Sequence, residues 1–95
     1  MLSLIPLDLT KVKKEDVDKE ILRASIIAEL DAIDLYEQMA NLTEDPNLKK
    51  VLMDVTKEEK THVGEFQALL LNLDQEQVQE LENGRKEVEE LTGGK

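Results

Sequence analysis

Cysteine and tryptophan are absent from this 95-residue chain, which has one tyrosine, one phenylalanine and two prolines. Without cysteine, disulfides, thiolate ligands and iron–sulfur clusters are excluded. The aromatic content of 2% means that any core is aliphatic. No uncharged apolar run is long enough to span a bilayer, and the first residues lack the basic and apolar regions of a secretory signal. We therefore expect a cytosolic protein.

Basic residues are also in the minority, because 22 acidic residues against 12 basic ones give a net charge of −10. An acidic surface repels nucleic acids and anionic membranes, so neither is expected as a partner, whereas metal cations are attracted. The length suffices for one small domain. A monomer of this size buries only about 60–65% of its unfolded surface and is marginally stable.

Two long stretches carry apolar residues at alternating steps of three and four, the period of one helix face. They predict helices over about 15–41 and 46–71. Asp45 is a good N-cap for the second helix, and Pro46 suits its first position. The short connection makes the pair an antiparallel hairpin. The expected organisation is an arm (1–14), the hairpin (15–73), a short C-terminal helical segment (74–91) and a linker or expression-derived end (92–95).

The flanking segments are simpler. The arm is expected to be extended, and its apolar residues either pack on a neighbouring surface or fray. Asp74 followed by Gln77 predicts a short helix over about 75–82. Asn83–Gly84 is expected to interrupt it before one or two further turns.

Three ionisable side chains interrupt the apolar stripes: Glu29 in the first helix, and Glu59 and His62 in the second. Burying a charged carboxylate without a partner costs several kcal/mol or more. Each of the two glutamates must therefore be paired, protonated or metal-bound. The midpoints of two antiparallel helices of similar length lie level, which brings the three side chains to one height. Carboxylate oxygens with an imidazole nitrogen suit iron, manganese or zinc. We predict a metal site of Glu29, Glu59 and His62.

One chain supplies only half of such a centre. A four-helix di-metal carboxylate site uses two single glutamates and two Glu-x-x-His pairs. Residues 21–30 are apolar almost all round their helix, which a hairpin alone cannot bury. The predicted fold is therefore all-α, a two-helix hairpin plus a short C-terminal helix that dimerises into a four-helix bundle with the metal site across the interface.

The segments IIAELDAIDLY (26–36) and EEKTH (58–62) resemble the encapsulated ferritins, a branch of the ferritin-like superfamily housed in encapsulin nanocompartments. The resemblance covers residues 20–73 and is nearest to members fused to the shell protein. It implies a ferroxidase with a di-iron centre, using Fe(II) and dioxygen, in a decameric ring of five dimers inside an encapsulin shell. It implies that Glu29, Glu59 and His62 are the iron ligands and that Tyr36 lies beside them.

The chain departs from the type member of that family in several places. A tryptophan is replaced by Leu35, and two glutamates of an outer metal-uptake site correspond to Ala28 and Asp31. Asp31 is thus the candidate uptake ligand, with Asp34 as a further candidate. No terminal shell-docking peptide is recognised, so either the chain comes from a fusion or another element docks.

Three functions remain open from the residues. The leading one is an iron-dependent ferroxidase, with manganese or zinc as substitute metals. The second is a non-catalytic metal-binding module, and the third is a structural helical oligomer that holds the three side chains in a hydrogen-bond network. A rubrerythrin-like electron-transfer enzyme is disfavoured because the chain lacks a cysteine cluster.

Overall fold

The computed structural model describes residues 8–94, and the regular structure in this part of the chain is entirely helical, without a strand. Two 3₁₀ turns precede three α-helices. The elements are η1 (Leu9–Lys11), η2 (Lys14–Asp16), α1 (Val17–Leu42), α2 (Pro46–Leu73) and α3 (Gln75–Thr92). The predicted all-α class is confirmed. Among the described helices, none is both long and apolar enough to cross a membrane.

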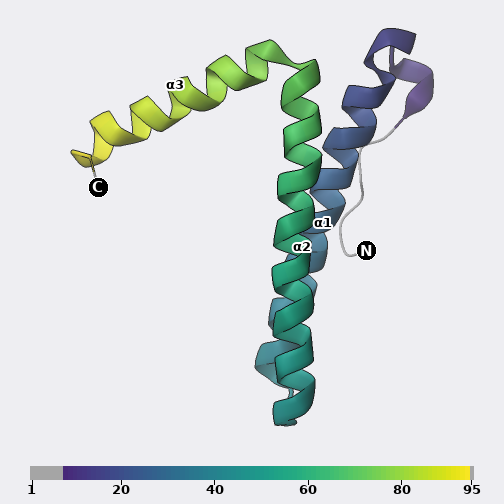
Figure 1. Ribbon diagram of the computed structural model, residues 1–95, viewed down its shortest axis with the longest axis vertical. Coiled ribbons are helices and arrows are strands. Elements are labelled where there is room, and N and C mark those ends of the chain that lie inside the picture. Colours follow the sequence, from purple (N-terminus) through teal and green to yellow (C-terminus); the bar gives the residue numbers. More distant parts are fainter. Residues whose placement is uncertain (1–7, 95) are drawn as a thin grey trace.

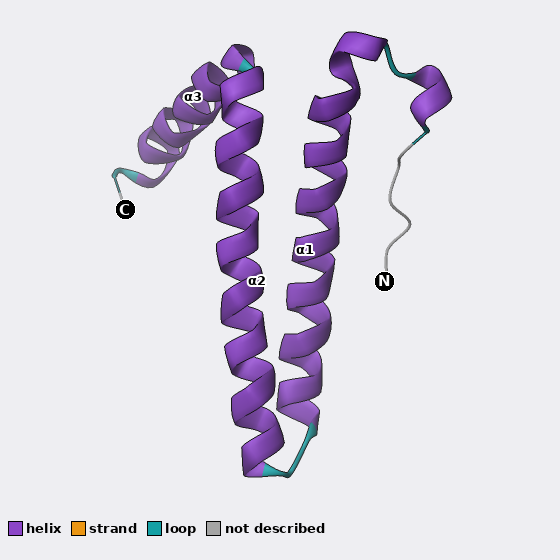
Figure 2. Ribbon diagram, turned by 45° about the vertical axis from the view of Figure 1, so that its right-hand side comes forward, coloured by secondary structure: helices purple, strands orange, loops and turns teal. Residues whose placement is uncertain are grey.

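Helices α1 and α2 form the predicted antiparallel hairpin and lie side by side, closest near the turn and further apart at the open end (Figure 2). Their contact buries a thin aliphatic seam. The buried seam residues are Leu22, Ile33 and Ala40 on α1, with Thr56 and Leu70 on α2. At the turn, the Asp45 carboxylate accepts hydrogen bonds from the backbone N–H groups of Asn47 and Leu48, at 2.9 and 3.3 Å. The predicted cap is thereby confirmed.

Helix α3 leaves the open end of the hairpin and projects away from it (Figure 1). It runs unbroken for 18 residues, so the predicted interruption at Asn83–Gly84 is wrong. Side-chain pairs three and four residues apart offset the poor helix propensity of these two residues. Asn83 bonds to Gln79 and Glu80, each at 3.2 Å, and Arg85 pairs with glutamates on both sides. Gly93, with φ of 69°, ends the helix in the left-handed conformation.

The predicted extended arm at 1–14 is corrected over the part that is described. Residues 1–7 lie outside the part of the chain that the structure describes. From Asp8 onward the chain forms the two 3₁₀ turns rather than an extended strand, and the Asp8 carboxylate accepts from the N–H of Thr10 at 3.1 Å. This local bond competes with extended backbone.

One carboxylate fixes the junction between the hairpin and α3. Asp74 accepts a hydrogen bond from the backbone N–H of Gln77 at 3.0 Å, which caps α3, and its other oxygen lies 3.0 Å from Arg23 on α1. The bond from Gln77, followed by that from Arg23, lowers the pKa of Asp74 below its usual value. Because the folded pKa lies below the unfolded one, the stabilisation is complete above about pH 4 and is lost as pH falls through the lowered folded value.

We expect Asp74→Ala to increase amide hydrogen exchange in α3 several-fold while α1 and α2 keep their protection. The variant removes both the cap and the bond to Arg23. Hydrogen exchange read by mass spectrometry measures this, with Asp54→Ala on the exposed surface of α2 as the control. In the parent, the same loosening should begin only below about pH 4. Equal exchange in both variants would contradict a role for Asp74 in holding α3.

Gly64 lies in the exposed middle of α2, and a Cβ added there would meet nothing within 4 Å. Gly64→Ala is therefore expected to stabilise the protein by about 0.5–1 kcal/mol, because alanine loses less conformational entropy in a helix. Thermal melts measure this gain. Gly93→Ala is the matched control and should bring no gain, since φ at Gly93 is +69°. A loss of stability in Gly64→Ala would show that another chain packs against this side of α2.

Candidate metal centre

Glu29 on α1 lies opposite Glu59 and His62 on α2, as the helical stripes predict. One potential ligand atom from each residue lies within 4.8 Å of the other two. The Nδ1 atom of His62 is 3.4 Å from Glu59 Oε2 and 3.6 Å from Glu29 Oε2. The structure thus brings the three predicted ligands together on one side of the hairpin.

The helices position these groups with little local freedom. Glu59 and His62 are one turn apart on α2 and so project from the same face. An ion pair between Lys60 and Glu37, at 3.5 Å, joins the two helices beside the site. The sequence does not predict this pair, because helical periodicity does not show which charged side chains meet across a hairpin.

Burial decreases from the carboxylates to the imidazole. The side chains of Glu29 and Glu59 are each 19% exposed, whereas His62 is 44% exposed. The cluster therefore opens to the surface at His62, and a ligand reaching it from outside would pass the imidazole ring.

The Oε2 atom of Glu29 favours a bound cation more than any other atom of the cluster. It is buried and has no hydrogen-bond partner. An unsatisfied buried carboxylate oxygen is costly, and a bound cation would satisfy it. Two carboxylate oxygens and one imidazole nitrogen form a donor set that fits iron, manganese or zinc. Three protein ligands also leave coordination positions open for another group.

The other predicted site residues lie outside this cluster. Asp31 is buried on α1, and its position two residues after Glu29 places it on the far side of the helix. Tyr36 is half-buried on the same stripe as Glu29, two turns further along. Asp34 is exposed and Ala28 is half-buried. An uptake role for Asp31 and a role for Tyr36 beside the metal stay predictions.

Comparison with known proteins decides the family. The family model described as EncFtn-like matches residues 7–83, most of the chain. The chain belongs to the EncFtn-like family. The crystal structure of an encapsulated ferritin domain from Pyrococcus furiosus is similar to it, with a TM-score of 0.84 and 59% identity over 98% of this chain and 97% of that one. The predicted resemblance to the encapsulated ferritins is confirmed.

Two curated relatives are similar to this chain over almost all of its length. A ferritin-like–encapsulin shell fusion protein from Pyrococcus furiosus is 62% identical over 98% of this chain, which spans only 28% of that relative. An encapsulin nanocompartment cargo protein, EncC, from Myxococcus xanthus is 33% identical over 97% of this chain and is covered to 68%. The chain thus corresponds to a minor part of the first relative and to about two thirds of the second.

Proposed function

We propose that this chain is a ferroxidase domain that oxidises Fe(II) with dioxygen at a di-iron centre shared by two copies. The supporting observation is the cluster of Glu29, Glu59 and His62, whose buried Glu29 oxygen lacks a donor. Membership of the EncFtn-like family supports iron as the substrate metal.

The chemistry of the three side chains suits that reaction. Carboxylate oxygens are hard ligands, so Glu29 and Glu59 favour the more highly charged Fe(III) product over Fe(II). His62 supplies a neutral nitrogen donor when its ring is unprotonated. Two Fe(II) ions would give one electron each to one dioxygen molecule, which with two protons leaves as hydrogen peroxide. The negative carboxylates would stabilise the extra positive charge on each iron.

The partner in the site is a second copy of the chain. One protomer holds two carboxylates and one imidazole, half of the ligand set of a four-helix di-metal centre. The exposed edge of His62 leaves the cluster accessible to the ligands of a second protomer. The proposed dimers assemble as a ring of five.

We also propose that the ring works inside an encapsulin nanocompartment in the cytoplasm, where the oxidised iron is stored. The names of the two relatives, a shell fusion protein and an encapsulin cargo protein, support this partner.

The test is oxygen consumption when Fe(II) is added to the purified protein. We expect rapid uptake of oxygen, saturating at one iron ion per chain, because a dimer holds two iron ions. Zn²⁺ added first should block the reaction by occupying the same donors. Tight metal binding without oxygen uptake would instead indicate the non-catalytic metal-binding module. Failure to bind metal at all would indicate a structural oligomer.

A further inference from the structure

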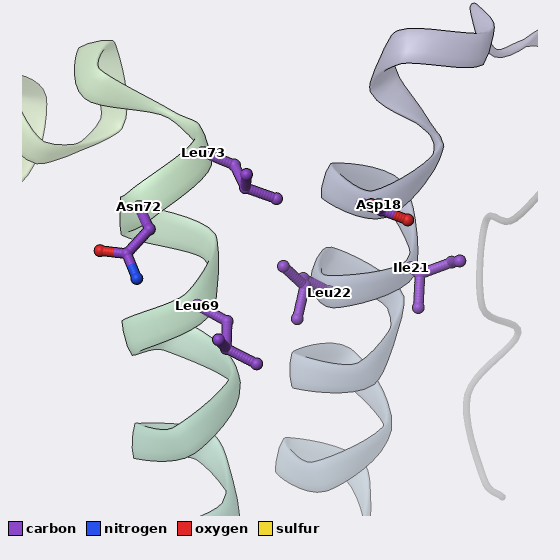
Figure 3. A pocket seen from close by; sticks show the side chains of 6 residues that line it. All are labelled: Asp18, Ile21, Leu22, Leu69, Asn72 and Leu73. Atoms are coloured by element: carbon purple, nitrogen blue, oxygen red, sulfur yellow. The ribbon is translucent and has the colours of Figure 1, made fainter.

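One face of α1 contacts α2, and Asp31 lies on the opposite face. Figure 3 shows the apolar groove at the open end of the hairpin, where Leu22 projects from α1 toward α2 and the neighbouring Ile21 projects away from α2. The seam that faces α2 continues from Leu22 through Ile33 to Ala40. At about 100° per residue, Asp31 is rotated by about 180° from Leu22. It therefore belongs to the outer face of α1, opposite the seam.

This outer face is covered, although α2 lies on the other side of the helix. Asp31 is only 8% exposed. Ile27 and Ala24, one and two turns before it on the same face, are half-buried. The outer face of α2 offers an internal comparison, because its residues are exposed as expected for a helix side in contact with water. These residues are Asp54, Glu58, Thr61 and Glu65.

The described elements do not account for the cover. Within residues 8–94, the elements in extensive contact with α1 are α2 and η2. The turn η2 ends at Asp16, next to the start of α1 at Val17. Asp31 lies 14 residues beyond Val17, or about 21 Å along the helix, which is out of reach of η2. Helix α3 projects away from the hairpin (Figure 1).

The chain enters the described part on the side of the covered face. Both ribbon views place η1 on the side of α1 that faces away from α2 (Figure 1, Figure 2). The preceding residues, 1–7, have the sequence MLSLIPL, which is largely apolar and has no charged side chain. Seven extended residues span about 23 Å. This length matches the distance along α1 from its start to Asp31.

We propose that residues 1–7 lie along the outer face of α1 in the same chain and run antiparallel to the helix, with their first residues at Asp31. The apolar side chains of this segment cover Ala24 and Ile27, which removes apolar surface on both partners from water. Extended backbone has N–H groups with no partner inside the segment. Those near its start donate hydrogen bonds to the Asp31 carboxylate, which needs donors because it is buried. Asp31 is then a docking residue for the segment and not a ligand for iron uptake.

Thiol labelling tests the position of the segment, because the chain has no cysteine. Leu4→Cys and Ile5→Cys are compared, since adjacent side chains of extended backbone point to opposite sides. At least one should react with a maleimide about tenfold more slowly than Asp54→Cys on exposed α2, because the segment must first leave the helix. Adding Asp31→Ala should restore rapid labelling. Asp34→Ala, the same change at an exposed position nearby, is the matched control and should leave labelling slow.

A second variant, Ser3→Cys with Asp34→Cys, shows which chain the segment covers. Both positions lie near the proposed contact at Asp31, and Asp34 is exposed. A short bis-maleimide reagent should join the two cysteines within one chain, so that the product runs as a monomer on a denaturing gel. The two single variants measure the background of links between copies. A covalent dimer as the main product would place the segment on a neighbouring copy and would overturn the inference.

These experiments need neither iron nor oxygen, so their outcome is independent of the proposed ferroxidase activity. Labelling of Leu4→Cys and Ile5→Cys as fast as that of Asp54→Cys would overturn the inference. Slow labelling that Asp31→Ala leaves unchanged would overturn it as well, because the segment would then be held without Asp31.

Discussion

Glu59→Ala and His62→Ala are each expected to lower the initial rate of Fe(II) oxidation by about a hundredfold or more. Each substitution removes one of the three donors that converge within 4.8 Å, and even the outer partners of metal ligands are worth 10–100-fold. The rate of Fe(III) formation, followed by absorbance after rapid mixing, measures the loss. Circular dichroism should show unchanged helix content, because neither side chain belongs to the buried seam.

Glu58→Ala is the matched control for that experiment. It removes the same charge from the neighbouring position, but Glu58 is exposed and points about 100° away from Glu59. Its rate should stay within about twofold of the parent, since exposed charges contribute only weak, screened interactions. If Glu58→Ala proved as damaging as Glu59→Ala, the ligand set of the proposed centre would be wrong.

Glu29→Gln is expected to have opposite effects on the protein with and without metal. Without metal, the parent buries a carboxylate oxygen that has no hydrogen-bond donor. Glutamine keeps the shape but removes the buried charge and its repulsion with the Glu59 carboxylate, so the metal-free protein should gain stability, on the order of 1 kcal/mol. Metal affinity should fall at least tenfold, because a neutral amide is a weaker ligand than a carboxylate. Denaturant melts and metal titrations measure the two effects.

Glu65→Gln serves as the control, because it makes the same change at an exposed position of α2. It should alter both quantities little, since surface substitutions are usually within about 0.5 kcal/mol. A Glu29→Gln protein that is less stable without metal, yet binds iron as tightly as the parent, would identify Glu29 as a structural residue and not a ligand.

Most of the predictions that the structure confirms depend on interactions between residues close together in the sequence. The hairpin followed from periodicity, and its turn from Asp45 and Pro46, whose effects act within a few residues. The prediction of a helix break at Asn83–Gly84 was wrong. Several side-chain pairs there stabilise the helix by more than the low helix propensity of the two residues destabilises it. The prediction for residues 8–14 was also wrong, because a bond from Asp8 to the next turn replaced the expected extended arm.

The sequence by itself determined that Glu29, Glu59 and His62 meet, because two helices of similar length joined by a short turn must align their midpoints. Only the tertiary structure decided how they meet. It placed Glu29 Oε2 in a buried position without a donor and left His62 exposed, and it opened a groove at one end of the same face. These features depend on how the helices approach and rotate about their axes, which side-chain packing sets across the whole hairpin and which helical period alone does not specify.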